Sequence, residues 1–85
     1  MKNILICGAG GFIGGHLVAD LRRQGGWKIR AVDRKPLTDW YQVFHDVENV
    51  QADLQERVAC ERAVKDCEVV YNFAADMGGM GFIEL

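Results

Sequence analysis

The chain has 85 residues, of which 49% are hydrophobic and 26% are charged, as in a folded globular protein rather than a disordered one. The net charge is only −2 and the basic residues are scattered, so no surface for nucleic acid or for an anionic membrane is predicted. No apolar run approaches the roughly 20 residues of a membrane span, and none resembles a secretory signal, which favours a cytoplasmic location.

The first third of the chain alternates between strand and helix signals. Residues 3–7 are a continuous apolar run, typical of a strand buried on both faces, and residues 27–33 predict a second strand. Between them, residues 11–24 predict a helix that ends at Gly25-Gly26. The apolar residues that recur at helical spacing in it are Phe12, Ile13, Leu17, Val18 and Leu21.

The remaining elements continue this alternation. Residues 37–48 predict a short helix or an ordered loop, and residues 49–53 a third strand. Residues 54–66 predict a helix, residues 68–75 contain a fourth strand, and residues 82–85 resemble the opening of another helix. The expected inward stripe of the second helix is Leu54, Val58, Ala59, Ala63 and Val64.

Right-handed crossovers between these strands give a parallel sheet with strand order 3-2-1-4. The predicted fold class is therefore α/β, as the N-terminal part of a doubly wound (Rossmann) sheet. No linker, repeat or low-complexity segment interrupts residues 1–85, so we expect one partial domain and no second domain.

A glycine-rich turn connects the first predicted strand to the first predicted helix. Its spacing is G-x-x-G-x-x-G, at Gly8, Gly11 and Gly14. In such a corner the first glycine permits a tight turn, the middle one lets backbone amides approach phosphates, and the last allows helix and strand to pack closely. Unpaired amides at the helix N-terminus then attract a dinucleotide diphosphate. A tight connection without a ligand is the alternative interpretation of this pattern.

Acidic residues end two of the predicted strands. Asp33 lies about 20 residues beyond the glycine turn, where a carboxylate accepts hydrogen bonds from the adenosine ribose, which favours NAD over NADP. Arg34 and Lys35 follow it directly and keep the choice open. Asp53 could reach the adenine edge, or it could be a turn or helix-cap residue before the following helix.

The cysteines and histidines predict no metal or redox chemistry. Cys7, Cys60 and Cys67 include no C-x-x-C pair and are interpreted as reduced, mostly buried thiols. His16 and His45 have no companions at ligand spacing and are interpreted as surface residues. The small residues and glycines of 72–82 could admit the nicotinamide half of a cofactor and a substrate, or serve only packing and turn geometry.

Together, the glycine turn, Asp33, Asp53-Leu54 and residues 72–75 resemble the N-terminal cofactor-binding part of extended short-chain dehydrogenases/reductases, the NAD-dependent epimerase/dehydratase type. Residues 74–83 are similar to a segment of GDP-mannose 3,5-epimerases. The resemblance implies NAD as cofactor, a nucleotide-sugar substrate related to GDP-mannose, contacted by Gly78, and a homodimer in the full-length family. The NAD-binding residues it implies are Gly8, Gly11, Phe12, Ile13, Gly14, Asp33, Asp53, Leu54, Ala74 and Ala75.

The family's catalytic Tyr-x-x-x-Lys pair has no counterpart in the chain, because Tyr71 is followed four positions later by Ala75. We therefore assign no catalytic residue and expect the 85-residue chain alone, as a fragment of such an epimerase, to be inactive. The alternative hypothesis is a small non-catalytic nucleotide-binding or regulatory module, which could pair its exposed fourth strand with a partner.

Overall fold

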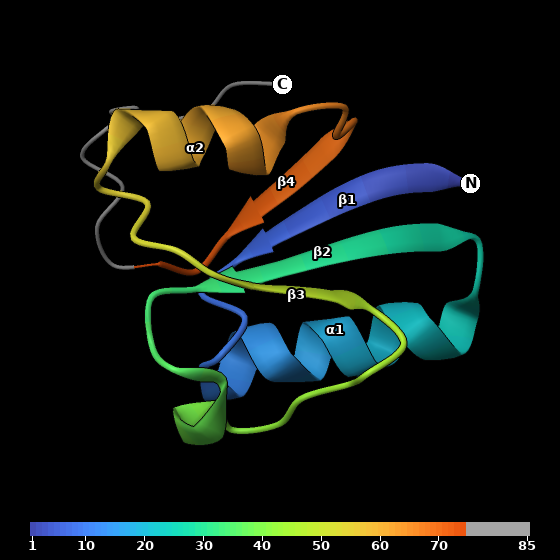
Figure 1. Ribbon diagram of the computed structural model, residues 1–85. Coiled ribbons are helices and arrows are strands. Elements are labelled where there is room, and N and C mark those ends of the chain that lie inside the picture. Colours follow the sequence, from blue (N-terminus) through green and yellow to red (C-terminus); the bar gives the residue numbers. More distant parts are fainter. Residues whose placement is uncertain (75–85) are drawn as a thin grey trace.

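A four-stranded parallel sheet with a helix against each face forms the body of the protein, as the computed structural model shows for residues 1–74 (Figure 1). The strand order β3-β2-β1-β4 confirms the predicted 3-2-1-4 arrangement. Ala75, Gly78 and the helix expected at 82–85 lie outside the described residues. The elements are β1 (Lys2–Cys7), α1 (Phe12–Gln24), β2 (Trp27–Asp33), the 3-10 turn η1 (Leu37–Asp39), β3 (Glu48–Gln51), α2 (Arg57–Val64) and β4 (Val69–Asn72).

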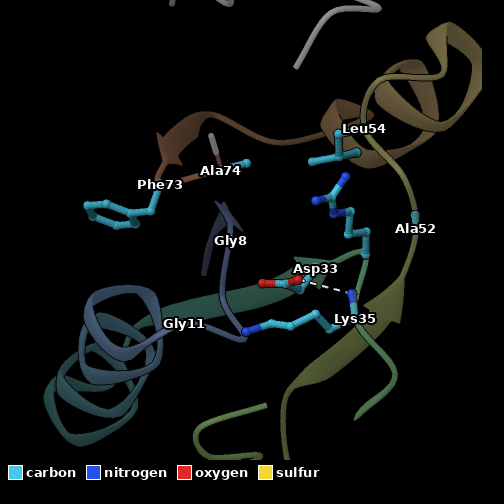
Figure 2. Close-up of a pocket in the computed structure, with 9 residues that line it drawn as sticks. Gly8, Gly11, Asp33, Lys35, Ala52, Leu54, Phe73 and Ala74 are labelled. Atoms are coloured by element: carbon cyan, nitrogen blue, oxygen red, sulfur yellow. Dashed lines mark hydrogen bonds between the residues drawn. The ribbon is translucent and has the colours of Figure 1, made fainter. Parts of the chain in front are cut away.

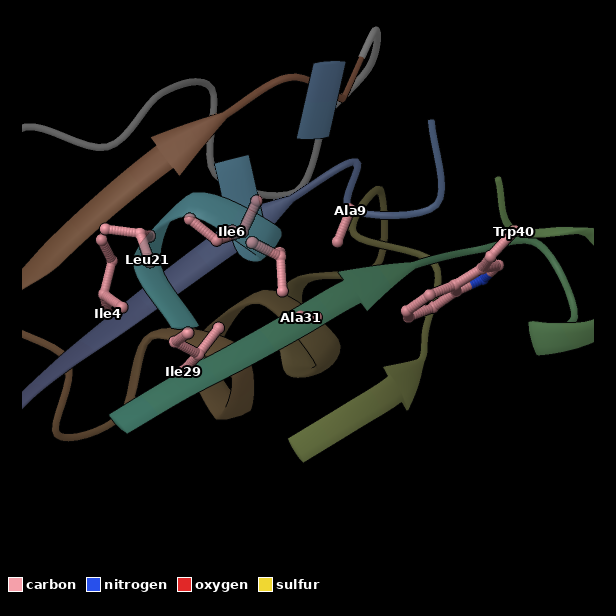
Figure 3. Close-up of a cluster of buried hydrophobic side chains, with 8 residues drawn as sticks. Ile4, Ile6, Ala9, Leu21, Ile29, Ala31 and Trp40 are labelled. Carbon is pink, nitrogen blue, oxygen red and sulfur yellow. The ribbon is translucent and has the colours of Figure 1, made fainter. Parts of the chain in front are cut away.

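The central strand β1 is buried on both faces, as its apolar run predicts. Because side chains alternate along a strand, Ile4 and Ile6 face α1 and pack in the cluster of Figure 3, whereas Leu5 and Cys7 face α2. The first cluster also contains Ala9, Val18, Leu21, Ile29, Ala31 and Trp40, and the second contains Val32, Leu54, Cys60 and Ala63. The sheet is therefore the shared wall of two cores.

Helical periodicity identifies both helices but misassigns part of their inward faces. Phe12 and Ile13, which belong to the apolar pattern of α1, are 60% and 63% exposed, and Val58, expected in the inward stripe of α2, is 59% exposed. The buried residues of α1 are Gly14, Gly15, Val18 and Leu21, and the two glycines let the first turn lie close to its neighbours. Apolar spacing alone overestimates burial where glycine makes the contact.

The boundaries around β3 and α2 differ from those expected. β3 ends at Gln51 and α2 begins at Arg57, two residues and three residues respectively from the predicted limits. The intervening segment forms a turn, in which the carbonyl of Asp53 accepts from Glu56 N at 3.0 Å and its carboxylate Oδ1 accepts from Gln55 N at 3.0 Å. Asp53 thus stabilises a turn that precedes the helix rather than capping the helix itself.

Residues 37–48, predicted to be a short helix or an ordered loop, contain both. The segment consists of η1 followed by a loop to Val47, and it packs beside α1. Trp40 is only 7% exposed and belongs to the core that α1 forms with the sheet. No helix within residues 1–74 is long and apolar enough to cross a membrane.

Arg30 connects β2 to the end of α2. Its Nη1 donates to the carbonyl oxygens of Ala63 at 2.7 Å and Lys65 at 3.0 Å, and its Nε donates to Glu48 Oε1 at 3.0 Å. These carbonyls lie at the C-terminus of α2, where the helix itself supplies no donor and where positive charge is favourable. The side chain is 24% exposed, so water screens these contacts only partly.

We expect Arg30→Met to lower the free energy of unfolding by about 2–3 kcal/mol, since charge-assisted hydrogen bonds to partly buried carbonyls are lost. Arg23→Met is the matched control, because Arg23 makes only an exposed ion pair with Asp20 and should cost about 0–1 kcal/mol. Urea denaturation of both variants measures the difference. An equal decrease in the free energy of unfolding for Arg30→Met and Arg23→Met would contradict a special role for Arg30.

Burial makes Cys7 sensitive to high pH. Its side chain has no exposed surface, and burial, assisted by Cys60 and Cys67, raises the pKa of the Cys7 thiol from 9.0 to about 12. Because the folded pKa is the higher one, the stabilisation is complete below pH 9 and is lost as the pH rises toward 12.

We therefore expect the free energy of unfolding to fall by up to about 1.4 kcal/mol per pH unit in that window, and Cys7→Ala to flatten the slope. The slope should be reduced rather than abolished, because burial also raises the pKa of Cys60 and Cys67. Urea titrations at several alkaline pH values check this. A slope unchanged by the substitution would exclude Cys7 as the main source.

Candidate functional site

The corner between β1 and α1 has the geometry that its glycine spacing predicts. Gly8 adopts a positive φ of 79°, and the amides of Gly8 and Ala9 both donate to the carbonyl of Val32, at 2.9 and 3.1 Å. A side chain at Gly8 would meet the backbone of Phe73 at 2.7 Å. Only glycine satisfies both the conformation and the space, so the predicted tight turn at Gly8 is confirmed.

Gly11 and Gly14 occupy different environments. A Cβ at Gly14 would lie 2.3 Å from the carbonyl oxygen of Gly8, whereas one at Gly11 would meet no atom of residues 1–74 closer than 3.5 Å. The packing role predicted for Gly14 is therefore confirmed. The space at Gly11 is open, as a phosphate approach requires, and the phosphate role itself stays a prediction.

The N-terminus of α1 presents donors without helical partners. The first bond within the helix runs from Gly15 N to Gly11 O at 2.9 Å, so the amides of Phe12, Ile13 and Gly14 precede it. Gly11, the N-cap residue, provides no side-chain cap. These amides and the helix dipole form an environment suited to an anion. Phe12 and Ile13 would contribute through their backbones, since their side chains are exposed.

Asp33 lies at the end of β2, directly beside the glycine turn (Figure 2). Its Oδ2 accepts a hydrogen bond from Gly10 N at 2.9 Å, and its Oδ1 accepts one from Lys35 N at 3.0 Å. Each carboxylate oxygen keeps one further lone pair, so the group could still accept hydrogen bonds from two ribose hydroxyls. The carboxylate thus lies where the ribose interpretation needs it.

A cavity of about 360 Å³ opens between these groups. It lies at the carboxyl ends of the strands, which is where doubly wound sheets bind ligands. The walls come from three strand ends and the turn after β3, and Figure 2 shows them facing one another. Its lining residues are Gly8, Gly11, Asp33, Arg34, Lys35, Ala52, Leu54, Phe73 and Ala74.

The structure brings together only part of the predicted cofactor site. Gly8, Gly11, Asp33, Leu54 and Ala74 line the cavity, whereas Phe12, Ile13, Gly14 and Asp53 do not. Asp53 Oδ1 instead accepts from Gln55 N in the turn before α2. The binding roles of all these residues stay predictions.

Sequence reasoning does not assign Arg34, Lys35, Ala52 and Phe73 to the site, although they line the cavity. The available signal was their position, because each is the residue directly after β2, β3 or β4, or the next one along. In a parallel sheet these positions converge at one edge. Among residues 1–74, no group of three His, Cys, Asp or Glu side chains could hold a metal ion.

Comparison with known proteins assigns the family. A model described as the NAD dependent epimerase/dehydratase family matches residues 4–82. The chain belongs to this family. Its backbone is also similar to the crystal structure of dTDP-glucose 4,6-dehydratase from Bacillus anthracis in complex with NAD, with a TM-score of 0.74 and 28% identity, over 89% of this chain and 27% of that one. The expected cofactor, NAD, is thereby confirmed at the level of the family.

Two curated relatives differ in their chemistry. The chain is 37% identical over 87 residues to GDP-mannose 3,5-epimerase 1 from Oryza sativa subsp. indica. It is 31% identical over 81 residues to a 3 beta-hydroxysteroid dehydrogenase/Delta 5→4-isomerase from Mycobacterium tuberculosis. Each match covers 95% of this chain and only 21% of the relative, so the chain spans about a fifth of their length.

Because Gly14 is closely packed and Gly11 is not, we expect alanine to affect stability differently at the two positions. Gly14→Ala should destabilise the fold by about 1–3 kcal/mol, because its Cβ would overlap the Gly8 carbonyl. Gly11→Ala should change stability by less than about 1 kcal/mol, since Gly11 has a φ of −85° and free space. Thermal unfolding followed by circular dichroism measures both. A larger loss for Gly11→Ala would contradict the packing interpretation.

Proposed function

We propose that the chain binds NAD through its adenosine diphosphate half, as the N-terminal part of a nucleotide-sugar epimerase. The observation that carries the proposal is the cavity in which the open glycine turn and the Asp33 carboxylate lie side by side (Figure 2). The unpaired amides at the start of α1 would hold the diphosphate, and Asp33 would accept hydrogen bonds from the adenosine ribose. Leu54 and Ala52 would offer an apolar wall to the adenine.

A sugar nucleotide resembling GDP-mannose is the substrate class we propose for the complete protein. The 37% identity to the rice epimerase and the similarity of residues 74–83 support it over the steroid chemistry of the mycobacterial relative. In the proposed reaction, NAD transiently oxidises the sugar, which acidifies the neighbouring carbon–hydrogen bonds, and then returns the hydride. Gly78 as a substrate contact, a homodimer and a cytoplasmic location belong to the same proposal.

We assign the proton transfers of that reaction to residues beyond this chain. General acid–base catalysis needs groups within hydrogen-bond reach of the reacting carbon, and the described cavity carries one carboxylate with both oxygens already bonded to backbone amides. The role that we propose for the 85-residue chain is to bind and orient the cofactor.

The alternative, a non-catalytic nucleotide-binding module, draws support from β4. Within residues 1–74 this strand pairs only with β1. The exposed side chains of Tyr71 and Phe73 stack on each other, with their ring centroids 6.5 Å apart. An uncovered strand edge can pair with another chain. Light scattering that shows a stable complex of the chain with itself or a partner would favour this alternative over a monomeric cofactor-binding part.

Calorimetric titration with two halves of the cofactor tests the binding proposal. ADP-ribose should bind about as tightly as NAD, and nicotinamide mononucleotide should bind much more weakly, because the polar groups to which we assign binding, the glycine turn and Asp33, contact the adenosine diphosphate half. NADP should bind at least about tenfold more weakly than NAD, since its 2′-phosphate would meet the Asp33 carboxylate. No heat from NAD or ADP-ribose at millimolar concentration would overturn the proposal.

A further inference from the structure

Gly10 is the one glycine of the turn to which the motif assigns no role, yet its N–H is bonded to the last residue of β2 and its carbonyl to the segment after β2. Its N–H donates to Asp33 Oδ2 at 2.9 Å. Its carbonyl accepts from Tyr41 N at 2.9 Å and from the Lys35 ammonium at 3.3 Å. The peptide units on both sides of Gly10 are therefore held by residues 23 to 31 positions away in the sequence.

The groups that hold Gly10 are themselves connected. Lys35 N donates to the second Asp33 oxygen, and the Lys35 carbonyl accepts from Trp40 Nε1 at 2.9 Å. The Trp40 ring covers Gly10 so closely that a Cβ there would lie 2.8 Å from Cδ1. Trp40 is 7% exposed, so this packing is part of the core (Figure 3). The turn is thus held by the last residue of β2 and by the segment that follows β2.

From these contacts we propose that Asp33 is a positioning residue for the diphosphate-binding turn, in addition to its ribose role. This inference rests on the proposed function, in which the turn binds the diphosphate. By holding Gly10 N, the carboxylate fixes the peptide unit between Ala9 and Gly10, two residues before α1 begins, while Lys35 and Tyr41 hold the peptide unit that leads into Gly11. A turn ordered before the ligand arrives loses less conformational entropy on binding.

The two roles of Asp33 predict opposite effects on an anion that has no ribose. If Asp33 only recognised ribose, replacing it with asparagine would remove a negative charge near the diphosphate and strengthen anion binding. If Asp33 positions the turn, the same change weakens binding. Asparagine has a single acceptor oxygen, so its NH₂ group would face the N–H of either Gly10 or Lys35.

Inorganic pyrophosphate is therefore the probe, titrated into the 85-residue chain and followed through the backbone amide resonances of residues 11–14. We expect Asp33→Asn to raise its Kd at least about threefold, a difference of about 0.7 kcal/mol. Asp33→Glu keeps the charge and displaces the carboxylate by one methylene, so it should also weaken binding. Asp39→Asn is the charge-matched control, because Asp39 lies outside the cavity lining. It should leave the Kd within about twofold or lower it slightly.

Unchanged or tighter pyrophosphate binding in both Asp33 variants would overturn the positioning role. A second measurement needs no ligand. The Gly10 amide should exchange with solvent at least about tenfold faster in Asp33→Asn than in the unmodified chain, whereas amides of β1 should be unaffected. An unchanged rate at Gly10 would also overturn the proposal. If the unmodified chain does not bind pyrophosphate, but the Gly10 amide exchanges faster in Asp33→Asn as expected, the proposed function fails and the positioning contact stands.

Discussion

The contact between the first turn of α1 and the end of β1 determines what this corner of the molecule can do. Gly14 lies against the Gly8 carbonyl with no room for a Cβ, and Gly8 in turn lies against the backbone at Phe73. The Gly8 peptide is thus enclosed between a helix and a neighbouring strand. The amides that precede the first hydrogen bond of α1 therefore lie near the end of β1, at the edge where the strands converge. Gly8 and Gly11 of this corner line the cavity at that edge.

The sequence predicted those features that local chemistry controls. A doubly buried apolar run identified β1, Gly25-Gly26 marked the end of α1, and handedness rules gave the strand order. Predictions were wrong where a local pattern has two solutions. Asp53 could begin a helix or a turn, and its backbone and side chain both bond within a turn, so α2 starts three residues later than expected.

The features that sequence reasoning missed are contacts between distant segments. Arg30 reaches the end of α2 and Trp40 covers Gly10, across separations of 30 residues or more. Neither residue carries a local signal for these roles, since an arginine in a strand and a tryptophan in a loop are ordinary surface or core residues. The outward direction of Phe12 and Ile13 was equally hidden, because it depends on how closely Gly14 lets the helix approach.

The charges around the cavity favour NAD for a reason beyond the position of Asp33. Arg34 and Lys35 follow it and would ordinarily suggest a site for a 2′-phosphate. The Lys35 ammonium, however, donates to the Gly10 carbonyl at 3.3 Å, on the side of the glycine turn. Meeting a phosphate on the ribose would require it to leave that contact, with the Asp33 carboxylate still repelling the phosphate. In the proposed binding mode, the Lys35 ammonium would support the diphosphate-binding turn, and the Asp33 carboxylate would select the ribose.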